Sequence, residues 1–333
     1  MSAVASIRPL EKRDIPETRH ILRLAFGTFL GAPDPEKFWP DLDYAGGRFG
    51  AEHVEAFAAE DKDRLIGTIF ATRWGSVAFF GPVTVRPDVW DGGVGQQLVQ
   101  AACDQFDAWG ISHAGLFTFP QSAKHVWTYG KFGFHPRFLT PVMGIAAKAG
   151  AKVGYQLHGA LPDGERREAE AQVRALTEQL YPGLDLGAEI RTVFQRKLGD
   201  TLLLTEGDSR IVGFAICHCG PGTEAGDGTL FVKFGAVAPG AGAEERFAGL
   251  FDACVDRATT LGLANVVAGV NTARESAYRQ MQKRGFRTLL QVSRCIVPTS
   301  RVTVGPSSMC WMIGDRVGRS CHRLTAAPDR LAA

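Results

Sequence analysis

An internal repeat runs through most of this chain of 333 residues. Five landmarks of the first half return 152 residues later: Val85 at Val237, Pro87 at Pro239, Leu98 at Leu250, Gly110 at Gly262, and Gly133-Phe134 at Gly285-Phe286. An earlier pair of segments, 60–67 and 206–213, is 146 residues apart, so the second copy holds six extra residues, expected in the glycine-rich stretch 220–228. Such a repeat predicts two lobes of common ancestry.

The repeat sets the predicted domain boundaries at residues 1–146 and 155–298. Small residues between the two lobes have the composition of a linker. The tail, 299–333, matches nothing in the first lobe, and the sequence assigns it no role. A hydrophobic content of 45% is enough for two packed cores.

Hydrophobic periodicity predicts an α/β (α+β) fold, in which each lobe is a mixed, mostly antiparallel sheet flanked by helices. A D-x-x-E capping box at Asp14 and Glu17 is expected to open the first helix. The other elements expected in the first lobe are strands 53–60, 65–74 and 77–85, helix 93–109, strand 113–119, helix 122–132 and an extended segment 138–145. The second lobe repeats this order, with helices at 166–180, 243–261 and 272–284 and a strand at 264–271.

Composition excludes several kinds of partner. The 37 basic and 35 acidic residues give a formal charge of +2 and form no runs, which argues against nucleic-acid and membrane binding. No signal peptide or spanning segment is expected, and seven scattered cysteines indicate reduced thiols in the cytoplasm. Cys217-His218-Cys219 lies in a predicted strand, where neighbours face opposite sides, so no metal site is predicted.

A strand enters a helix through a glycine-rich turn at residues 83–98. Such a turn exposes backbone N–H groups at a helix N-terminus, where they bind phosphates, although tight helix-strand packing would also require glycine. A nicotinamide dinucleotide fold is disfavoured, because Leu98 stands where that motif has its third glycine and the strand 113–119 has no acidic residue for a ribose.

The turn resembles the phosphate loop of the GCN5-related N-acetyltransferase (GNAT) family, Gln/Arg-x-x-Gly-x-Gly/Ala. Residues 90–95, Trp-Asp-Gly-Gly-Val-Gly, match it except at Trp90. A second family landmark, Tyr-x-x-x-Gly-Phe, is matched by residues 129–134. The resemblance covers about 7–145 well and 156–297 more loosely, so the chain resembles a tandem member of the family.

The resemblance implies an enzyme that transfers an acyl group, in the first instance acetyl, from acyl-CoA to an amine. It implies Tyr129 as the general acid that protonates the departing thiolate. The acceptor is expected to be a small molecule. A protein or peptide amine is the close variant, and a CoA-binding regulatory protein without activity is the alternative. The implied cofactor-binding residues are Val83, Thr84, Val85, Asp91, Gly92, Gly93, Val94, Gly95 and Gln96.

The general base and the acceptor pocket are less defined. The strand 77–85 has no carboxylate, so Glu55, His113, His135 or solvent is left to take the proton from the amine. Aromatic residues of the first helix, its following loop and the central strands are expected to line an apolar acceptor pocket, and the candidates are Phe29, Phe38, Trp74 and Phe80.

The second lobe is predicted to be degenerate. With the offset of 152, Gly93 falls on Glu245, Gly95 on Phe247 and Tyr129 on Met281, while Gly240 and Gly242 lie too early. One chain is therefore expected to bind one CoA, in the first lobe. A shifted loop in the second lobe, or an active second lobe beside a relic first one, is the competing interpretation.

Overall fold

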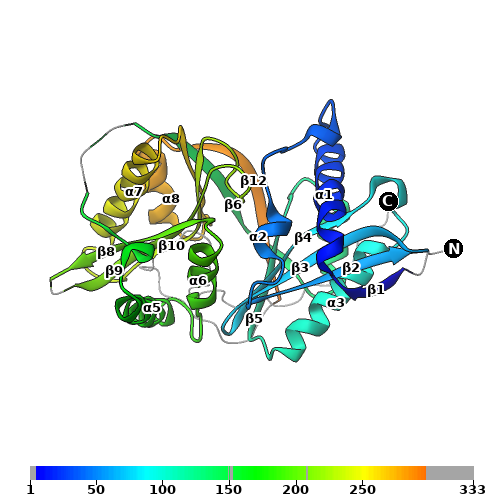
Figure 1. The fold of residues 1–333 in the computed structure, drawn as a ribbon, viewed down its shortest axis with the longest axis horizontal. Coiled ribbons are helices and arrows are strands. Elements are labelled where there is room, and N and C mark those ends of the chain that lie inside the picture. The colour runs from blue at the N-terminus through cyan, green and yellow to red at the C-terminus, as the bar shows by residue number, and fades with distance from the viewer. Residues whose placement is uncertain (1–4, 149, 151–152, 208, 298–333) are drawn as a thin grey trace, which may run out of the picture.

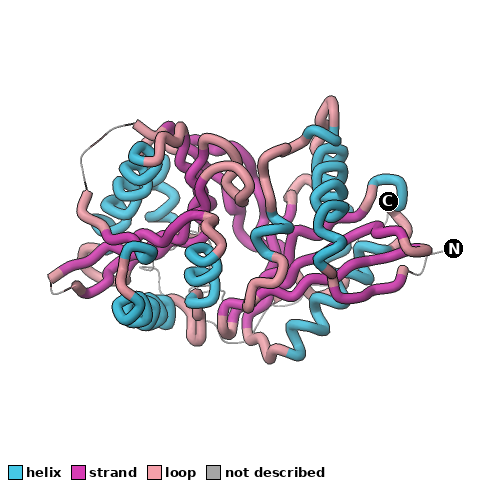
Figure 2. The backbone as a smooth tube through the Cα atoms, in the orientation of Figure 1, coloured by secondary structure: helices cyan, strands magenta, loops and turns pink. Residues whose placement is uncertain are grey.

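The computed structural model describes residues 5–148, 150, 153–207 and 209–297, so the tail 299–333 lies outside the described residues. It contains two halves joined by one sheet of 12 strands (Figure 1). The strand order is β1-β2-β3-β4-β5-β12-β6-β11-β10-β9-β8-β7. Figure 2 shows these strands in magenta passing from one half into the other, with helices on both faces.

The first half follows the predicted order of elements, with a short strand and a short helix that the sequence did not predict. The unpredicted elements are β1 (Ser6–Pro9) and α2 (Tyr44–Arg48). The other elements are α1 (Ile15–Phe29), β2 (Val54–Asp61), β3 (Arg64–Trp74), β4 (Val77–Val85), α3 (Val94–Ala108), β5 (His113–Thr118), α4 (Ala123–Gly130) and β6 (His135–Ala146).

The second half repeats this plan. Its elements are β7 (Gln156–Leu157), α5 (Asp163–Glu178), α6 (Gly187–Gln195), β8 (Gly199–Glu206), β9 (Arg210–Cys219), β10 (Thr229–Val237), α7 (Ala243–Thr260), β11 (Asn265–Gly269), α8 (Glu275–Lys283) and β12 (Arg287–Ile296). Cys217 and His218 lie in β9, and both are buried. No helix within the described ranges is long and apolar enough to cross a membrane.

The last strands of the two halves are exchanged. β6, from the first half, pairs with β11 of the second half, and β12, from the second half, pairs with β5 of the first. β6 and β12 also pair with each other, and they lie side by side where the two halves meet (Figure 1). The boundaries at 146 and 298 stay a prediction, but each half of the sheet is completed by a strand from the other half.

Helices cover opposite faces of the sheet because the strand side chains alternate. In the first half, Phe70 of β3 packs in the cluster that includes α1, whereas the neighbouring Ile69 packs with α3. The predicted capping box at Asp14 and Glu17 is wrong. The carboxylate of Asp14 accepts hydrogen bonds from Arg8 (2.7 Å) and the Glu11 N–H (2.8 Å), so it faces away from the first turn of α1.

Candidate functional site

A gap opens in the sheet between β4 and β5. The two strands run parallel and pair from Val77–His113 to Phe80–Leu116. Opposite β3, the register shifts between Ile69 and Ala71, so two residues of β4 face one of β3, which is a β-bulge. Residues 83–85 continue to pair with β3 but not with β5.

A cavity of about 640 Å³ occupies this gap. It is lined by residues of α1, β4, α3 and α4 and of the loops before α3 and α4. Because α1 and α3 lie on opposite faces of the sheet, a cavity that touches both passes between the strands. Its size is within the range of small-molecule sites. The predicted cofactor-binding and catalytic residues at the cavity are Val83, Val85, Asp91, Gly93, Val94, Gly95, Gln96 and Tyr129.

Two of the predicted cofactor residues are not among those that line the cavity. Thr84 is buried, and its hydroxyl lies 3.0 Å from that of Thr68 on β3. Gly92 lies in the loop before α3, where an added Cβ would come within 3.2 Å of the Val89 carbonyl oxygen. Thr84 alternates with Val83 and Val85, so the pleat of β4 turns it away from the cavity.

The loop between β4 and α3 has the geometry of an anion cradle. Gly93 precedes the first residue of α3 with a φ of +83°, a left-handed conformation that favours glycine. The N–H groups of Gln96 and Gln97 bond to the Gly93 carbonyl oxygen at 3.1 and 3.3 Å. Those of Val94 and Gly95, the first two of α3, are the donors that a helix leaves without an internal partner.

Trp90, where the sequence departs from the family motif, has a structural contact. Its indole N–H donates a hydrogen bond of 2.7 Å to the carbonyl oxygen of Val85, the last residue of β4. The side chain therefore ties the loop to the end of the strand. The backbone donors of the cradle do not depend on this side chain.

The open end of the cavity carries most of its charges. The ammonium of Lys124 lies 2.5 Å from an Asp91 carboxylate oxygen, which joins α4 to the loop. Lys131 lies 3.4 Å from the side-chain oxygen of Gln96 and 3.6 Å above the ring of Trp127. Asp91, Lys124, Trp127 and Lys131 are exposed. This end of the cavity therefore has two cations and one carboxylate.

The inner end of the cavity is aromatic. Tyr129 packs on Phe80, with ring centroids 5.8 Å apart, and burial raises the pKa of its phenol, so it stays protonated at neutral pH. His125 lies one turn earlier on α4, and its ring centroid is 4.9 Å from that of Phe29. Burial, and then the charge of Lys124, lower the pKa of His125 below 6.5, so the imidazole is neutral at pH 7.

The sequence did not single out His125, although its spacing of four from Tyr129 places both on one helix face. Of the aromatic candidates, Phe29 lines the cavity and Phe38 packs on Trp39 with ring centroids 4.4 Å apart. Phe80 is buried beneath Tyr129. Trp74 is buried where the halves meet, and its indole donates to a Glu189 carboxylate oxygen at 3.1 Å.

None of the three suggested bases is among the residues that line the cavity. Glu55 is exposed on β2, and His135 is exposed at the start of β6. His113 is buried, and its Nε2 lies 2.5 Å from the guanidinium of Arg294. Burial, and then the charge of Arg294, lower the pKa of His113 to about 3. Two of these residues are solvated and the third belongs to the core.

Comparison with known proteins agrees with this geometry. Residues 15–134, which contain the gap, the loop and α4, match the Acetyltransferase (GNAT) family. These residues form a GNAT domain. Acetyl-CoA is the acyl donor of this family. A search of curated protein sequences finds no significant match.

Solved structures with the same fold cover nearly the whole chain. A putative acetyltransferase from Pyrococcus horikoshii is 14% identical with a TM-score of 0.65, and the match covers 91% of this chain and 92% of that one. A GCN5-related N-acetyltransferase from Sphaerobacter thermophilus is 16% identical (TM-score 0.56, covering 88% and 95%). A tandem GNAT protein from the clavulanic acid biosynthesis pathway is 12% identical (TM-score 0.55, covering 90% and 100%). The chain therefore has the tandem GNAT fold.

The second GNAT-like lobe keeps the glycine cap but adds nearly one turn to the helix behind it. α7 has 18 residues, whereas α3 has 15. It begins after Gly242, whose φ of +78° is close to that of Gly93. The prediction that Gly242 lies too early therefore needs correction, because the offset of 152 describes the end of the helix and not its start.

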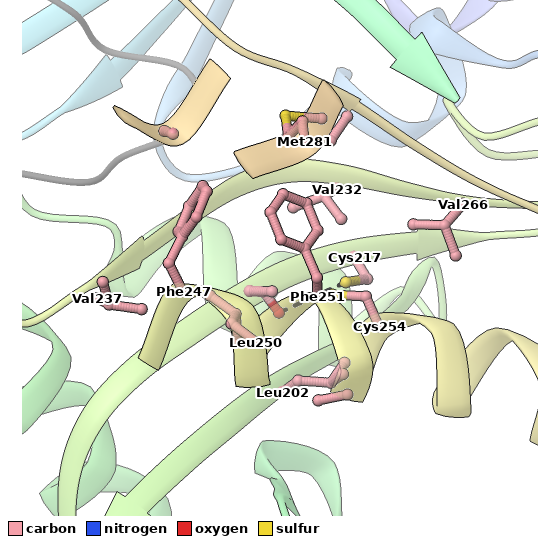
Figure 3. Packing of buried hydrophobic residues seen from close by; sticks show 14 of the residues in the cluster. Leu202, Cys217, Val232, Val237, Phe247, Leu250, Phe251, Cys254, Val266 and Met281 are labelled. Carbon is pink, nitrogen blue, oxygen red and sulfur yellow. Dashed lines mark hydrogen bonds between the residues drawn. The ribbon is translucent and has the colours of Figure 1, made fainter. Parts of the chain in front are cut away.

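Large side chains fill the equivalent space in the second lobe. When α3 and α7 are aligned on the glycines that follow them, Gly110 and Gly262, the residues equivalent to Gly95 and Val99 are Phe247 and Phe251. Gly95 and Val99 line the first cavity. Both rings are fully buried, with centroids 4.8 Å apart, and Figure 3 shows them on the side of α7 that faces Met281. Met281, at the position of Tyr129, is also fully buried. The first turn of α7 carries Glu244 and Glu245.

A buried cluster of charges joins the two lobes. The carboxylate of Glu224, in the loop that carries the insertion, accepts hydrogen bonds from Nε and Nη2 of Arg48 at 2.8 and 2.9 Å. Lys233 of β10 lies 2.9 Å from Glu224 and 2.9 Å from Glu189 of α6. The two cations lower the pKa of the Glu224 carboxyl well below its usual range, which outweighs the opposing effect of burial.

This cluster contacts β4 of the first lobe. The guanidinium of Arg48 also donates to the carbonyl oxygen of Gly81, at the bulge of β4. The backbone beside it is held as well, because the Asp43 N–H donates to Thr223 (2.9 Å) and the Gly222 N–H to Asp41 (2.8 Å). The loop 220–228 therefore packs on the segment that follows α1.

Proposed function

We propose that this chain is an N-acyltransferase that moves an acyl group, in the first instance acetyl, from acyl-CoA to an amine of a small molecule. The observation that carries the proposal is the cavity in the gap between β4 and β5. At one end it has a glycine-capped helix N-terminus, suited to a pyrophosphate, and at the other the partly buried phenol of Tyr129. In the second lobe, by contrast, the buried rings of Phe247 and Phe251 fill the equivalent space.

The roles follow from where each group lies. The amides of Val94 and Gly95 bind the pyrophosphate, and the backbone of residues 83–85, which does not pair with β5, receives the arm that carries the thioester. Acyl-CoA supplies a thioester carbonyl whose C–S bond breaks as the C–N bond to the amine forms. Tyr129 donates its phenolic proton to the departing sulfur. Burial disfavours the phenolate and the thiolate alike. Desolvation therefore raises the free energy of both anions and does not by itself oppose proton transfer from Tyr129 to the sulfur.

His125 is the residue that we propose as the proton acceptor for the amine. Among the side chains at the cavity, the imidazole is a neutral base at pH 7, whereas Lys124 and Lys131 are cations and Asp91 pairs with Lys124. After transfer, the imidazolium returns its proton to Tyr129, whose ring centroid is 6.3 Å away, through a water molecule. The proton count then balances, with a neutral amide and CoA thiol as products.

The proposed acceptor is a small amine with an apolar or aromatic part. Phe26, Phe29 and Phe119 line the inner cavity, and the ring centroids of Phe29 and Phe119 are 5.0 Å apart. The segment after α1, beside which the family binds its acceptor, is covered by the loop 220–228 of the second lobe. This cover favours a small acceptor over an amine on a folded protein.

We further propose that the second lobe neither binds CoA nor catalyses, and that it supports the first. Phe247, Phe251 and Met281 fill its core, and Glu244 and Glu245 are unfavourable for a pyrophosphate. Its contribution is the exchanged strand β12 and the cluster that holds Arg48 against β4.

Consumption of acetyl-CoA over a panel of amines tests the proposal, with free thiol as the readout. Turnover is expected with at least one aromatic or apolar amine. Tyr129→Phe should lower kcat by about 10²- to 10⁴-fold while the Kd for CoA stays within about twofold. Tyr278→Phe, on the equivalent helix of the second lobe, is the control and should retain full activity. Tight CoA binding without turnover on any amine would instead support the regulatory alternative.

A further inference from the structure

Three side chains of α4 and its C-terminal cap form an exposed face at the mouth of the cavity. Lys124, Trp127 and Lys131 are three and four residues apart, the spacing of neighbours on one side of a helix. Trp127 is 63% exposed, which is unusual for the largest apolar side chain, and the ammonium of Lys131 lies 3.6 Å from its ring centroid. An exposed indole beside a cavity is a candidate contact for a ligand.

This face borders the phosphate loop. Lys124 lies 2.5 Å from Asp91 and Lys131 lies 3.4 Å from Gln96, and all four residues line the cavity together with Trp127. CoA is a linear molecule in which the pyrophosphate separates the pantetheine arm from the 3′-phosphoadenosine. If the loop holds the pyrophosphate and the arm runs inward to Tyr129, the adenosine lies at the outer face.

The charges at this face also distinguish the two lysines. Lys124 is neutralised by Asp91, whereas Lys131 has no carboxylate within ion-pair distance in the described ranges. Its charge is therefore available to an anion. The indole beside it offers a flat surface of the kind on which nucleic-acid bases stack.

We propose that Trp127 stacks on the adenine and that Lys131 binds the 3′-phosphate of the acyl donor. This inference rests on the proposed function and names the donor class of that site. The first lobe then selects thioesters of CoA over those of dephospho-CoA, and over acyl groups on the phosphopantetheine of a carrier protein, which lacks the nucleotide. Lys131 and Trp127 are binding residues and take no part in the chemical step.

A helix-stabilising role for the Lys131–Trp127 pair is the competing explanation, because residues four apart on a helix often pair. On that explanation, neither Lys131 nor Trp127 affects the binding of the 3′-phosphate or of the adenine. Lys283, at the equivalent position of the second lobe, provides a matched control, since it is also a lysine at the C-terminal end of a short helix.

Calorimetric titration of CoA, dephospho-CoA and 4′-phosphopantetheine into the full chain tests the proposal. Wild type should bind CoA about tenfold more tightly than dephospho-CoA, the value of one charge-assisted contact. In Lys131→Met, this ratio should fall to about one while the Kd for dephospho-CoA is unchanged. Lys283→Met should retain the wild-type ratio.

Trp127→Leu tests the stacking contact. It should weaken both nucleotides by about tenfold, within the range for loss of one stacked base, and leave 4′-phosphopantetheine unaffected. Equal wild-type affinity for CoA and dephospho-CoA, or an unchanged ratio in Lys131→Met, would overturn the inference while leaving the proposed function intact. Failure of wild type to bind CoA would overturn both. Melting temperatures of the variants confirm that each is folded.

Discussion

Replacing Gly95 with aspartate should weaken phosphate binding without preventing the protein from folding. Gly95 is the second residue of α3, and a Cβ added there would lie 3.8 Å from a Val85 methyl, an ordinary contact. Gly95→Asp should therefore fold. An acidic side chain in the first turn of a helix is favourable by about 0.3–1 kcal/mol, so the melting temperature should stay the same or rise.

The same carboxylate opposes a pyrophosphate bound at the helix start. Two like charges 4 Å apart repel by about 4 kcal/mol at an effective dielectric constant of 20. Gly95 is half-buried at the edge of the cavity, and solvent screening should leave about 2–3 kcal/mol, or a loss of roughly 30- to 150-fold in CoA affinity. The second lobe already carries such carboxylates, Glu244 and Glu245, in the first turn of α7.

Calorimetry with CoA at fixed ionic strength measures this loss, and Gly95→Asn is the neutral control of the same shape. Asn should cost less than tenfold, and the loss in Gly95→Asp should shrink as salt is added. Wild-type affinity in a folded Gly95→Asp protein would show that the phosphates bind elsewhere. An equal loss in Asn and Asp would refute the electrostatic reasoning.

Three further outcomes are expected. Asp91→Asn should raise CoA affinity about threefold by freeing Lys124 for the phosphates, as calorimetry would show, and a weaker affinity would contradict this. Because the pKa of His125 is lowered, kcat/KM should persist as pH falls through 6.5 and decline only below it, and His125→Asn should lower kcat/KM and abolish that decline. Glu224→Gln removes the carboxylate that pairs with Arg48 and one of the two carboxylates beside buried Lys233, and it should lower the free energy of unfolding by about 3 kcal/mol in urea, whereas exposed Glu36→Gln should change it by less than about 0.5 kcal/mol.

Long elements with clear periodicity could be predicted from the sequence, because their spacing is a local property. β4 and α3 were predicted to within a residue or two of their observed ends. The five-residue helix α2 and the four-residue strand β1 are too short to show a period. The exchange of β6 and β12 could not be predicted, since alternation shows which side of a strand is buried and not which strand lies beside it.

In the candidate site, too, residues with a local sequence signal could be predicted, whereas residues placed by tertiary packing could not. The turn at Gly93 was recognisable because a glycine before a helix is a local signal, and Tyr129 followed from its family motif. Phe38, Trp74 and Phe80 were predicted as pocket residues but are not among those that line the cavity, because the direction of an aromatic side chain depends on tertiary packing. His125 has no motif of its own, and only the folded helix brings it beside the cavity.

The claim that one acyl-CoA site exists per chain, in the first lobe, is tested most directly by the stoichiometry of acetyl-CoA binding. Calorimetry of wild type should give one site. Gly93→Asp puts a charged side chain on a backbone with a φ of +83° and should abolish that site in a chain that still folds. Two sites in wild type, or one site that survives the substitution, would show that the second lobe binds acetyl-CoA and would contradict the account.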